Sequence, residues 1–484
     1  MTPLAVKPKN IFYAGAIIMR TSQHRTPIAD AILALRETTR HSFHALPIFQ
    51  GNSIGGGVIG AKYRALFGDN LFGTELTVTG KLFDNFFFSK SAIRESEDLA
   101  AALFGADGTL FVTTGTTTSN QIAISALHQC GRPVLIDKSC HQSIHFYLDT
   151  LKARVHYIKP QFYCAQSERS AWSIASLMEA VGNAERAGQS YDTIVLTAQS
   201  YEGLIYDIPK ILRQLLDAGT RTRKFLIDEA WGSANYFNPA LAESTAMHVG
   251  GLMHDYPDLE VVCTQSAHKS LSTLRQASMI HFRGGERLRE RLNIAKFRVH
   301  STSPSYPILV SLDMARAQME EEGECLVGNA LALAEDCRRR LQSGPQWSCY
   351  ALNSLPDLGR MNRFIHEDPC KLSIDIQALG LTASEVQGYL HREQGVYINR
   401  ITKGSILLNF HIGVTADAVE AVLDGLAFLQ AQQVSRSLEK IDSDRFIIPY
   451  PPGVPLVVPG ESITDDIMKK MEEIRKTGIS LLTI

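Results

Sequence analysis

The chain has 484 residues, with 48 Lys and Arg against 50 Asp and Glu, a net charge of −2 and a hydrophobic fraction of 45%. A near-neutral globular composition of this kind argues against nucleic acid or an anionic membrane as partner. Eight cysteines without a Cys-x-x-Cys pair argue against a zinc site and against a small disulfide scaffold. No apolar run approaches the roughly 20 residues that span a bilayer. We therefore expect a cytoplasmic protein.

The first 90 residues form an N-terminal segment with few clear elements. The apolar stretch 11–19 follows two lysines but has no convincing cleavage site after it, and we interpret it as a strand. Helical spacing of apolar residues predicts a helix over 29–37. The glycine-rich run Gly51–Gly57 predicts a loop, and because no Gly-Lys-Ser/Thr follows, it is not expected to be a nucleotide-binding P-loop.

From residue 91 the pattern becomes regular and predicts a large α/β domain over 91–310. Ser91 is placed to cap a helix that Gly105 ends. Short apolar runs then alternate with amphipathic stretches, which is typical of βα units and a mostly parallel sheet. The predicted strands contain residues 110–112, 134–136, 194–196, 225–227, 261–263 and 279–282.

A small α+β domain is predicted over 311–435. It begins with a long helix over 312–341, followed by a strand at 372–376 and a helix opened by a capping box at Thr382 and Glu385. Further elements are strands at 397–400 and 406–411 and a helix capped by Thr415. The tail, 436–484, contains Pro-Tyr-Pro-Pro-Gly-Val-Pro at 449–455, which we expect to be either an ordered loop over the domains or a linker, because proline does not suit a helix or a central strand.

Two polar motifs follow the first two predicted strands of the large domain. Thr113–Asn120 opens a helix, and hydroxyls with free N–H groups at a helix N-terminus suit a phosphate, although a threonine-rich cap would look the same. Asp137–Ser143 carries His141, which is either a flat platform for a planar ligand or an ordinary surface residue. Each motif alone is a weak signal.

Two further motifs follow the strands at 225–227 and 261–263. Asp228 would be buried and therefore needs a cation or hydrogen-bond donors, and a protonated pyridine nitrogen is such a partner. Lys269 sits at a desolvated strand end, where a lowered pKa makes an amine nucleophilic toward an aldehyde, although most lysines are only solvated charges. Together the four motifs provide a phosphate-binding site, an imidazole that can stack on a planar ring, a carboxylate for a ring nitrogen and an amine that can form a Schiff base. These are the groups that pyridoxal 5'-phosphate (PLP) requires.

The same stretches resemble the Orn/Lys/Arg decarboxylase family, PLP enzymes of the aminotransferase fold (fold type I). The resemblance covers about residues 90–465, where several motifs follow one another in the order typical of the family. These are Gly115-Thr116-Thr117-Thr118-Ser119-Asn120, Cys140-His141-Gln142-Ser143, Asp228-Glu229-Ala230-Trp231-Gly232, Gln265-Ser266-Ala267-His268-Lys269-Ser270, Gln276-Ala277-Ser278-Met279-Ile280-His281, Ser301-Thr302-Ser303-Pro304-Ser305-Tyr306-Pro307 and the proline-rich tail.

The resemblance implies a role for each site residue. Lys269 would form the Schiff base with PLP, Asp228 would hold the pyridinium proton, and either His268 or Lys269 would protonate Cα. The remaining cofactor-binding residues would be His141 stacked on the ring, Ala230 beneath it, and Gly115, Thr116, Thr117, Ser266 and His268 around the phosphate. Thr302 or Ser303 would reach the phosphate of a neighbouring subunit, which implies a homodimer with shared active sites and allows a higher oligomer.

The chain departs from the family pattern where the substrate's far end is expected. Asn399, Arg400 and Ile401 stand in place of the family's Glu-Lys-Thr, whose glutamate is expected near the distal amine. Arg400 either faces a carboxylate or is only a strand-end charge. The predicted function is PLP-dependent decarboxylation of arginine, lysine, ornithine or a derivative. The alternatives are an aminotransferase or oxygen-using deaminase on the same scaffold, or a non-catalytic regulatory family member.

Overall fold

The computed structural model describes residues 25–76, 82–164, 169–354, 364–398 and 400–438, together with short stretches of the tail at 441–442, 445–450, 455–459, 462–463, 465–476 and 480–483. The predicted strand at 11–19, Asn399 and residues 451–454 of the proline-rich motif lie outside the described residues. None of the helices within these ranges is both long and apolar enough to cross a membrane.

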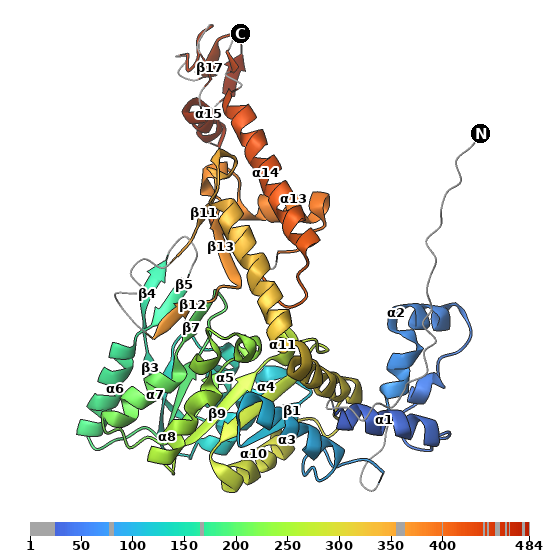
Figure 1. Ribbon diagram of the computed structural model, residues 1–484. Coiled ribbons are helices and arrows are strands. Elements are labelled where there is room, and N and C mark those ends of the chain that lie inside the picture. Colours follow the sequence, from blue (N-terminus) through green and yellow to red (C-terminus); the bar gives the residue numbers. More distant parts are fainter. Residues whose placement is uncertain are drawn as a thin grey trace.

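A seven-stranded sheet forms the centre of the large region (Figure 1), in the order β1-β10-β9-β8-β6-β2-β3. Every neighbouring pair from β9 to β3 is parallel, and β10 is antiparallel to both of its neighbours. The prediction of a mostly parallel α/β sheet is therefore confirmed. The strands are β1 Gly108–Val112, β2 Pro133–Asp137, β3 Arg154–Ile158, β6 Thr193–Thr197, β8 Lys224–Asp228, β9 Glu260–Gln265 and β10 Ser278–Arg283.

All six strands predicted for the large domain are present, and β3 is the strand of this sheet that the apolar pattern missed. It lies at the edge of the sheet, and only Ile158 of its five residues is buried. A strand that buries one residue has no continuous apolar run to reveal it, whereas the central strands are buried on both faces. In β3 the sequence Arg-Val-His-Tyr-Ile accordingly mixes polar and apolar residues.

Helices cover both faces of this sheet. Along β6, Ile194 and Leu196 pack with α6 and α7, whereas Val195 between them packs with α4 and α10, as the two-residue period of a strand requires. The helices of this region are α3 Ala92–Phe104, α4 Gly115–Leu127, α5 Gln142–Thr150, α6 Ile174–Arg186, α7 Ile208–Asp217, α8 Gly250–Asp255, α9 Ala267–Ser270 and α10 Gly285–Val299. Short 3-10 turns are η2 Ser233–Phe237, η3 Ala242–Ser244 and η4 Ala246–Val249.

The predicted helix after Ser91 is present, but its cap differs from the expectation. Gly105 ends α3 in the left-handed conformation, as predicted, with φ of 69°. The Ser91 hydroxyl makes no capping bond and instead donates to the carbonyl of Phe83. The buried Asp84 carboxylate accepts from the N–H groups of Ser91 and Ile93 at 2.9 and 3.0 Å, and so caps the helix from seven residues upstream.

The N-terminal helices are attached through α11, Tyr306–Leu341. Asp313 of α11 accepts from the N–H groups of Ile28 and Ala29, which open α1, Pro27–Thr38, at 2.9 and 3.1 Å. α2, Val58–Thr74, stands away from the body of the molecule in Figure 1. The glycine-rich loop is present between η1, Phe49–Gly51, and α2, as the sequence predicts.

A four-stranded sheet in the order β11-β13-β15-β14 forms the small region at the far end of α11. The capping box of Thr382 and Glu385 is confirmed, and Leu423 and Leu426 pack inward as expected. Its elements are η5 Pro345–Trp347, β11 Ala351–Leu352, β13 Lys371–Asp375, η6 Gln377–Leu379, α13 Ala383–Gln394, β14 Arg400–Ile401, β15 Ser405–Asn409 and α14 Ala416–Leu438. We propose that 91–310 and 311–435 are the two domains and that α11 links them.

Smaller pairs of strands complete the fold. β12, Ile365–Glu367, pairs with β7, Leu204–Tyr206, and so joins the segment before β13 to the large region. Pro449 and Tyr450 lie in the two-stranded ribbon of β17 and β19, so this part of the tail is an edge strand and not the expected loop. The remaining elements are β4 Pro160–Cys164, β5 Arg169–Trp172, β16 Ile441–Asp442, β17 Ile447–Tyr450, β18 Ser462–Ile463, α15 Asp465–Lys476 and β19 Ser480–Thr483.

Asp84→Ala should destabilise the protein far more than Ser91→Ala. The first substitution leaves several N–H groups at the start of α3 without an acceptor and should lower the free energy of unfolding by about 2 kcal/mol. The second removes one hydroxyl bond and should cost no more than about 1 kcal/mol. Urea unfolding of both variants measures the difference, and a larger loss for Ser91→Ala would contradict the observed cap.

Candidate active site

The four predicted motifs meet around one cavity of about 280 Å³. It lies where β1, β2, β8 and β9 end, which is the edge at which open α/β sheets bind ligands. The lining residues are Thr114, Gly115, Thr116, Thr117, Asn120, His141, Asp228, Ala230, Ser266, His268, Lys269, Arg275 and Gln276. The sequence interpretation assigned no role to Thr114, Asn120, Arg275 or Gln276, although three of them lie within motifs that it quoted.

Asp228 and Glu229 point to opposite sides of β8, and only Asp228 faces this cavity. The Asp228 carboxylate is 3% exposed and accepts from the Ala230 N–H at 2.9 Å. The Glu229 carboxylate turns into the core, where it accepts from the Ala246 N–H at 2.6 Å and the Tyr236 hydroxyl at 3.0 Å. Burial raises the pKa of Glu229. Its partners lie in the core, and Glu229 does not line the cavity.

Asn120 connects Asp228 to His141 through a chain of hydrogen bonds. Its Nδ2 donates to Asp228 Oδ2 and to the Ser143 hydroxyl, both at 3.2 Å, while its Oδ1 accepts from the Thr264 hydroxyl at 2.6 Å. The Ser143 N–H donates to His141 Nδ1 at 3.2 Å, so Nδ1 is an acceptor and the neutral ring carries its proton on Nε2. One amide group therefore fixes both the acid and the exposed imidazole.

The N-terminus of α4 is prepared for an anion. Its N-cap, Thr114, makes no side-chain capping bond, and the Thr114 hydroxyl oxygen is buried without a partner among the described residues. Gly115 begins the helix with φ of 83°, a conformation that favours glycine. The helix dipole and the N–H groups of this first turn suit a phosphate.

Buried hydroxyls join the start of α4 to the strand ends beside it. The Ser278 hydroxyl donates to the carbonyl of Gln265 at 2.7 Å, so it accepts from Thr116, whose oxygen lies 2.9 Å away. Thr116 in turn accepts from Ser266 at 2.6 Å. Ser266 is the first donor in this row of hydrogen bonds. Its hydroxyl can turn its hydrogen toward a ligand while the bonds from Thr116 to Ser278 and from Ser278 to Gln265 stay in place.

Lys269 lines the same cavity and lies in the short helix α9. Its Nζ lies 4.4 Å from the ring centroid of Trp231. Burial lowers the pKa of Lys269, and the charge of Asp228 acts in the opposite direction. A lowered pKa increases the fraction of neutral amine at neutral pH, which is the form that attacks an aldehyde.

His268 precedes the lysine and is held in one tautomer. Its Nδ1 lies 2.9 Å from the carbonyl oxygen of Ala277, which can only accept, so Nδ1 carries the proton. Burial lowers the pKa of His268, so the ring is neutral at pH 7. This arrangement leaves Nε2 as the nitrogen that can exchange a proton with a ligand.

These features fit PLP. The uncapped helix terminus and the partnerless Thr114 hydroxyl suit its phosphate, the Asp228 carboxylate suits a protonated ring nitrogen, and the exposed face of His141 suits a planar ring. Lys269 supplies an amine for the aldehyde. Among the described residues no group of three or more His, Cys, Asp or Glu side chains is arranged to hold a metal ion.

Three of the predicted residues lie outside this cavity. Thr302 and Ser303 are exposed at the end of α10 and are not in its lining. Arg400 lines a separate cavity of about 570 Å³ with Trp231 and Lys371, and its guanidinium pairs with Glu202 at 3.2 Å. Arg400 therefore does face a carboxylate, but it is one of this chain.

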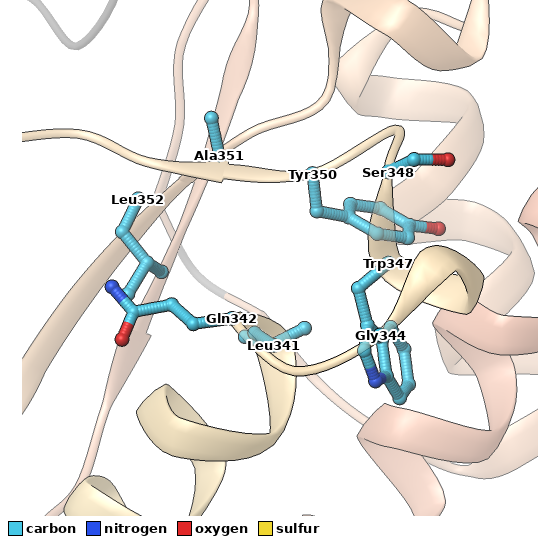
Figure 2. A pocket seen from close by; sticks show the side chains of 8 residues that line it. All are labelled: Leu341, Gln342, Gly344, Trp347, Ser348, Tyr350, Ala351 and Leu352. Carbon is cyan, nitrogen blue, oxygen red and sulfur yellow. The ribbon is translucent and has the colours of Figure 1, made fainter.

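Another hollow, of about 260 Å³, lies between the end of α11 and β11 (Figure 2). Tyr350 is its one titratable side chain, and its hydroxyl donates to the carbonyl of Leu426 at 2.6 Å. Burial raises the pKa of Tyr350. The hollow shares no residue with the cavity around Lys269 and offers no reactive group.

Comparison with known proteins agrees with this geometry. Residues 26–418 match the model of the Orn/Lys/Arg decarboxylase major domain. An arginine decarboxylase of Halalkalibacterium halodurans is 25% identical, over 94% of this chain and 95% of its own length. A biodegradative arginine decarboxylase of Escherichia coli is 30% identical over 68% of this chain and 45% of its own length.

Solved structures show the same fold. The lysine decarboxylase LdcF of Francisella novicida superposes with a TM-score of 0.72 at 21% identity, covering 96% of this chain and 79% of its own. A serine palmitoyltransferase of Sphingomonas wittichii superposes with a TM-score of 0.53 at 16% identity, covering 80% of this chain and 86% of its own. The predictions of fold type I and of PLP as cofactor are confirmed. The chain belongs to the Orn/Lys/Arg decarboxylase family and is a PLP-dependent amino-acid decarboxylase.

Proposed function

We propose that this chain decarboxylates a basic amino acid, either arginine, lysine, ornithine or a derivative of one of them. The observation that carries the proposal is the convergence of Lys269, Asp228 and His141 on one cavity beside the open N-terminus of α4. The relatives named above act on arginine and lysine according to their names, which supports a basic substrate.

Bound PLP would supply an electron sink for the electron pair that is left on Cα when the substrate carboxylate leaves as carbon dioxide. Asp228 holds a proton on the ring nitrogen, because a buried carboxylate stabilises the adjacent cation. Asn120 keeps that carboxylate in place through its 3.2 Å bond. Withdrawal of electrons into the ring depends on this proton.

The other residues bind and orient. The Thr116 and Thr117 N–H groups, with the hydroxyls of Thr114 and Ser266, hold the phosphate. His141 and Ala230, which both line the cavity, would pack against the ring. Lys269 would attach the cofactor through its amine, and either Lys269 or His268 through Nε2 would return a proton to Cα.

The distal end of the substrate would extend past Trp231 toward Arg400. The ring of Trp231 lies 4.4 Å from Lys269 Nζ and 4.3 Å from Lys371 Nζ, so it borders both the catalytic amine and the larger cavity. Glu202, which pairs with Arg400, is our candidate for the acid that recognises a basic side chain, because asparagine stands at 399 in place of the family's glutamate. A substrate cation would then compete with Arg400 for this carboxylate.

We also propose a cytoplasmic homodimer in which Thr302 or Ser303 of one subunit completes the phosphate site of the other. Both residues are exposed and lie outside the cavity of their own chain, as this arrangement requires. Asn399 and Arg400 remain the proposed substrate-side residues.

Incubation with a panel of amino acids tests the reaction and its substrate together. Arginine, lysine or ornithine should release carbon dioxide and yield the corresponding amine by mass spectrometry. Lys269→Ala should release none, because it removes the amine that attaches the cofactor. Turnover that needs oxygen or a 2-oxo acid and gives no carbon dioxide would contradict the proposed reaction.

Asp228→Asn and Glu229→Gln form a matched pair at adjacent positions. Asp228→Asn removes the charge that holds the ring-nitrogen proton and should lower kcat about a hundredfold or more. Glu229→Gln changes an acid on the other side of the strand and should leave kcat close to the wild-type value. Carbon dioxide release is measured at equal PLP content, and equal losses in the two variants would contradict the assigned faces.

Asn120→Ala should lower kcat about tenfold, because a charge-assisted hydrogen bond to Asp228 is lost. Asn353→Ala is the control, since Asn353 bridges Ser373 and Ser405 in the small sheet and lies away from the cofactor. The control should lose stability but keep its kcat. Wild-type kcat in the Asn120 variant would show that the Asp228 carboxylate needs no orienting amide.

A further inference from the structure

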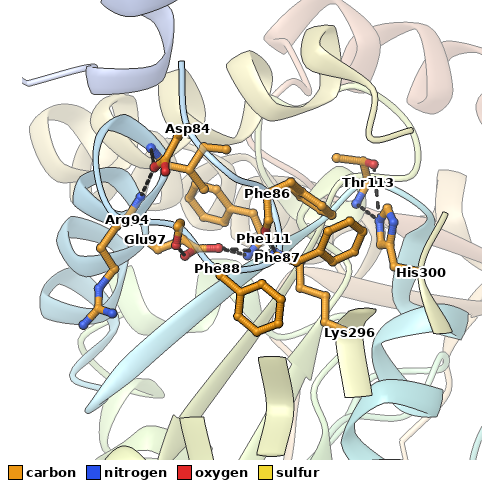
Figure 3. A network of polar contacts seen from close by, with 12 residues as sticks. Asp84, Phe86, Phe87, Phe88, Arg94, Glu97, Phe111, Thr113, Lys296 and His300 are labelled. Atoms are coloured by element: carbon orange, nitrogen blue, oxygen red, sulfur yellow. Dashed lines mark hydrogen bonds and ion pairs between the residues drawn. The ribbon is translucent and has the colours of Figure 1, made fainter. Parts of the chain in front are cut away.

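At one edge of the central sheet, side chains accept hydrogen bonds from backbone N–H groups. β1 is the terminal strand, and the N–H groups of Phe111 and Thr113 bond to side chains instead of a neighbouring strand (Figure 3). The Phe111 N–H donates to Glu97 Oε1 at 3.0 Å, and the Thr113 N–H donates to His300 Nε2 at 3.1 Å. The second bond lies immediately before the turn that begins α4.

His300 is fixed in the tautomer that can accept this bond. Its Nδ1 lies 2.7 Å from the carbonyl oxygen of Ser301, so Nδ1 carries the proton and Nε2 accepts from Thr113. The side chain is buried, with its ring 4.8 Å from that of Phe86. Burial lowers the pKa of His300 to about 4, which keeps the ring neutral at pH 7.

A buried ion pair between Lys296 and Glu97 supports Phe86, the residue whose ring packs against His300. Lys296 and Glu97 are both 1% exposed and lie 3.6 Å apart. Lys296 Nζ also donates to the carbonyl of Phe86 at 2.8 Å and lies 3.7 Å from the centroid of the Phe86 ring. Lys296 therefore helps to hold in position the aromatic residue that contacts His300.

Thr113 is held from two directions by the segment that follows α10. His300 accepts from its N–H, and its hydroxyl oxygen accepts from the Ser305 N–H at 3.3 Å. Two residues later the Gly115 N–H donates to the carbonyl of Gln276 at 2.9 Å. The turn Thr113–Gly115, which carries the uncapped N-terminus of α4, thus has both ends fixed.

We propose that His300 is a positioning residue for the cofactor phosphate: it anchors the Thr113–Gly115 turn to the Ser301–Ser305 segment, so that the first N–H groups of α4 face the phosphate. This inference rests on the proposed phosphate site. His300 touches neither substrate nor cofactor and acts through the backbone of Thr113. His300 also holds the backbone of Ser301, from which the exposed residues Thr302 and Ser303 continue.

Two amide substitutions distinguish the acceptor role of His300 Nε2 from the donor role of its Nδ1. His300→Gln can place an amide oxygen near the Nε2 position and keep the acceptor for Thr113. His300→Asn can place an amide nitrogen near Nδ1, which keeps the donor to the Ser301 carbonyl but loses the acceptor. His156→Leu is the control, because His156 lies on the opposite edge strand β3 and bonds the Tyr191 hydroxyl.

The dissociation constant for PLP is measured on each full-length apoprotein, alongside its thermal unfolding midpoint. His300→Asn should weaken PLP binding about tenfold, as the loss of a buried N–H acceptor predicts, and His300→Gln should restore affinity close to wild type. His156→Leu should lower the unfolding midpoint without changing the dissociation constant. A merely structural His300 would give the same pattern as this control.

Folded His300→Asn protein that binds PLP as tightly as the wild type would overturn the inference and leave the proposed function standing. The inference also fails if His300→Gln and His300→Asn weaken binding equally, since the acceptor would then not matter. Wild-type apoprotein that takes up no PLP would overturn the proposed function together with this inference.

Discussion

A buried negative charge at the end of β8 constrains the rest of the site. The Asp228 carboxylate is 3% exposed, and an isolated charge at such a position is very costly unless donors or a cation surround it. The protein supplies the Ala230 N–H and the Asn120 amide, both of which are neutral. We propose that a cationic ring nitrogen would complete this environment and stabilise the carboxylate.

The other residues follow from the geometry of a parallel sheet. Because the carboxyl ends of β2, β6, β8 and β9 meet at one edge, motifs far apart in sequence converge there. The two-residue period of β8 sends Asp228 toward the cavity and Glu229 into the core. The dipole of α4 favours an anion at the helix N-terminus, which borders the same cavity as Lys269.

Much of this could be predicted from the sequence, for identifiable reasons. Central strands are buried on both faces and therefore appear as apolar runs. Asp228 is the last residue of β8, and Lys269 lies in the short helix α9 that comes after β9. The capping box at Thr382 is local, and the structure confirms it. Contacts that are not local were missed: Asn120 meets Asp228 across 108 residues, and His300 meets Thr113 across 187. The cap of α3 was wrongly given to Ser91 because Asp84 reaches it through a folded loop.

The ionisation state of the cofactor tests the central claim most directly. Apoprotein reconstituted with PLP labelled with ¹⁵N at the ring nitrogen would be studied by NMR at neutral pH. Our account predicts the chemical shift of a protonated ring nitrogen in the wild type and of an unprotonated one in Asp228→Asn. An unprotonated nitrogen in the wild type would contradict the role of the buried carboxylate.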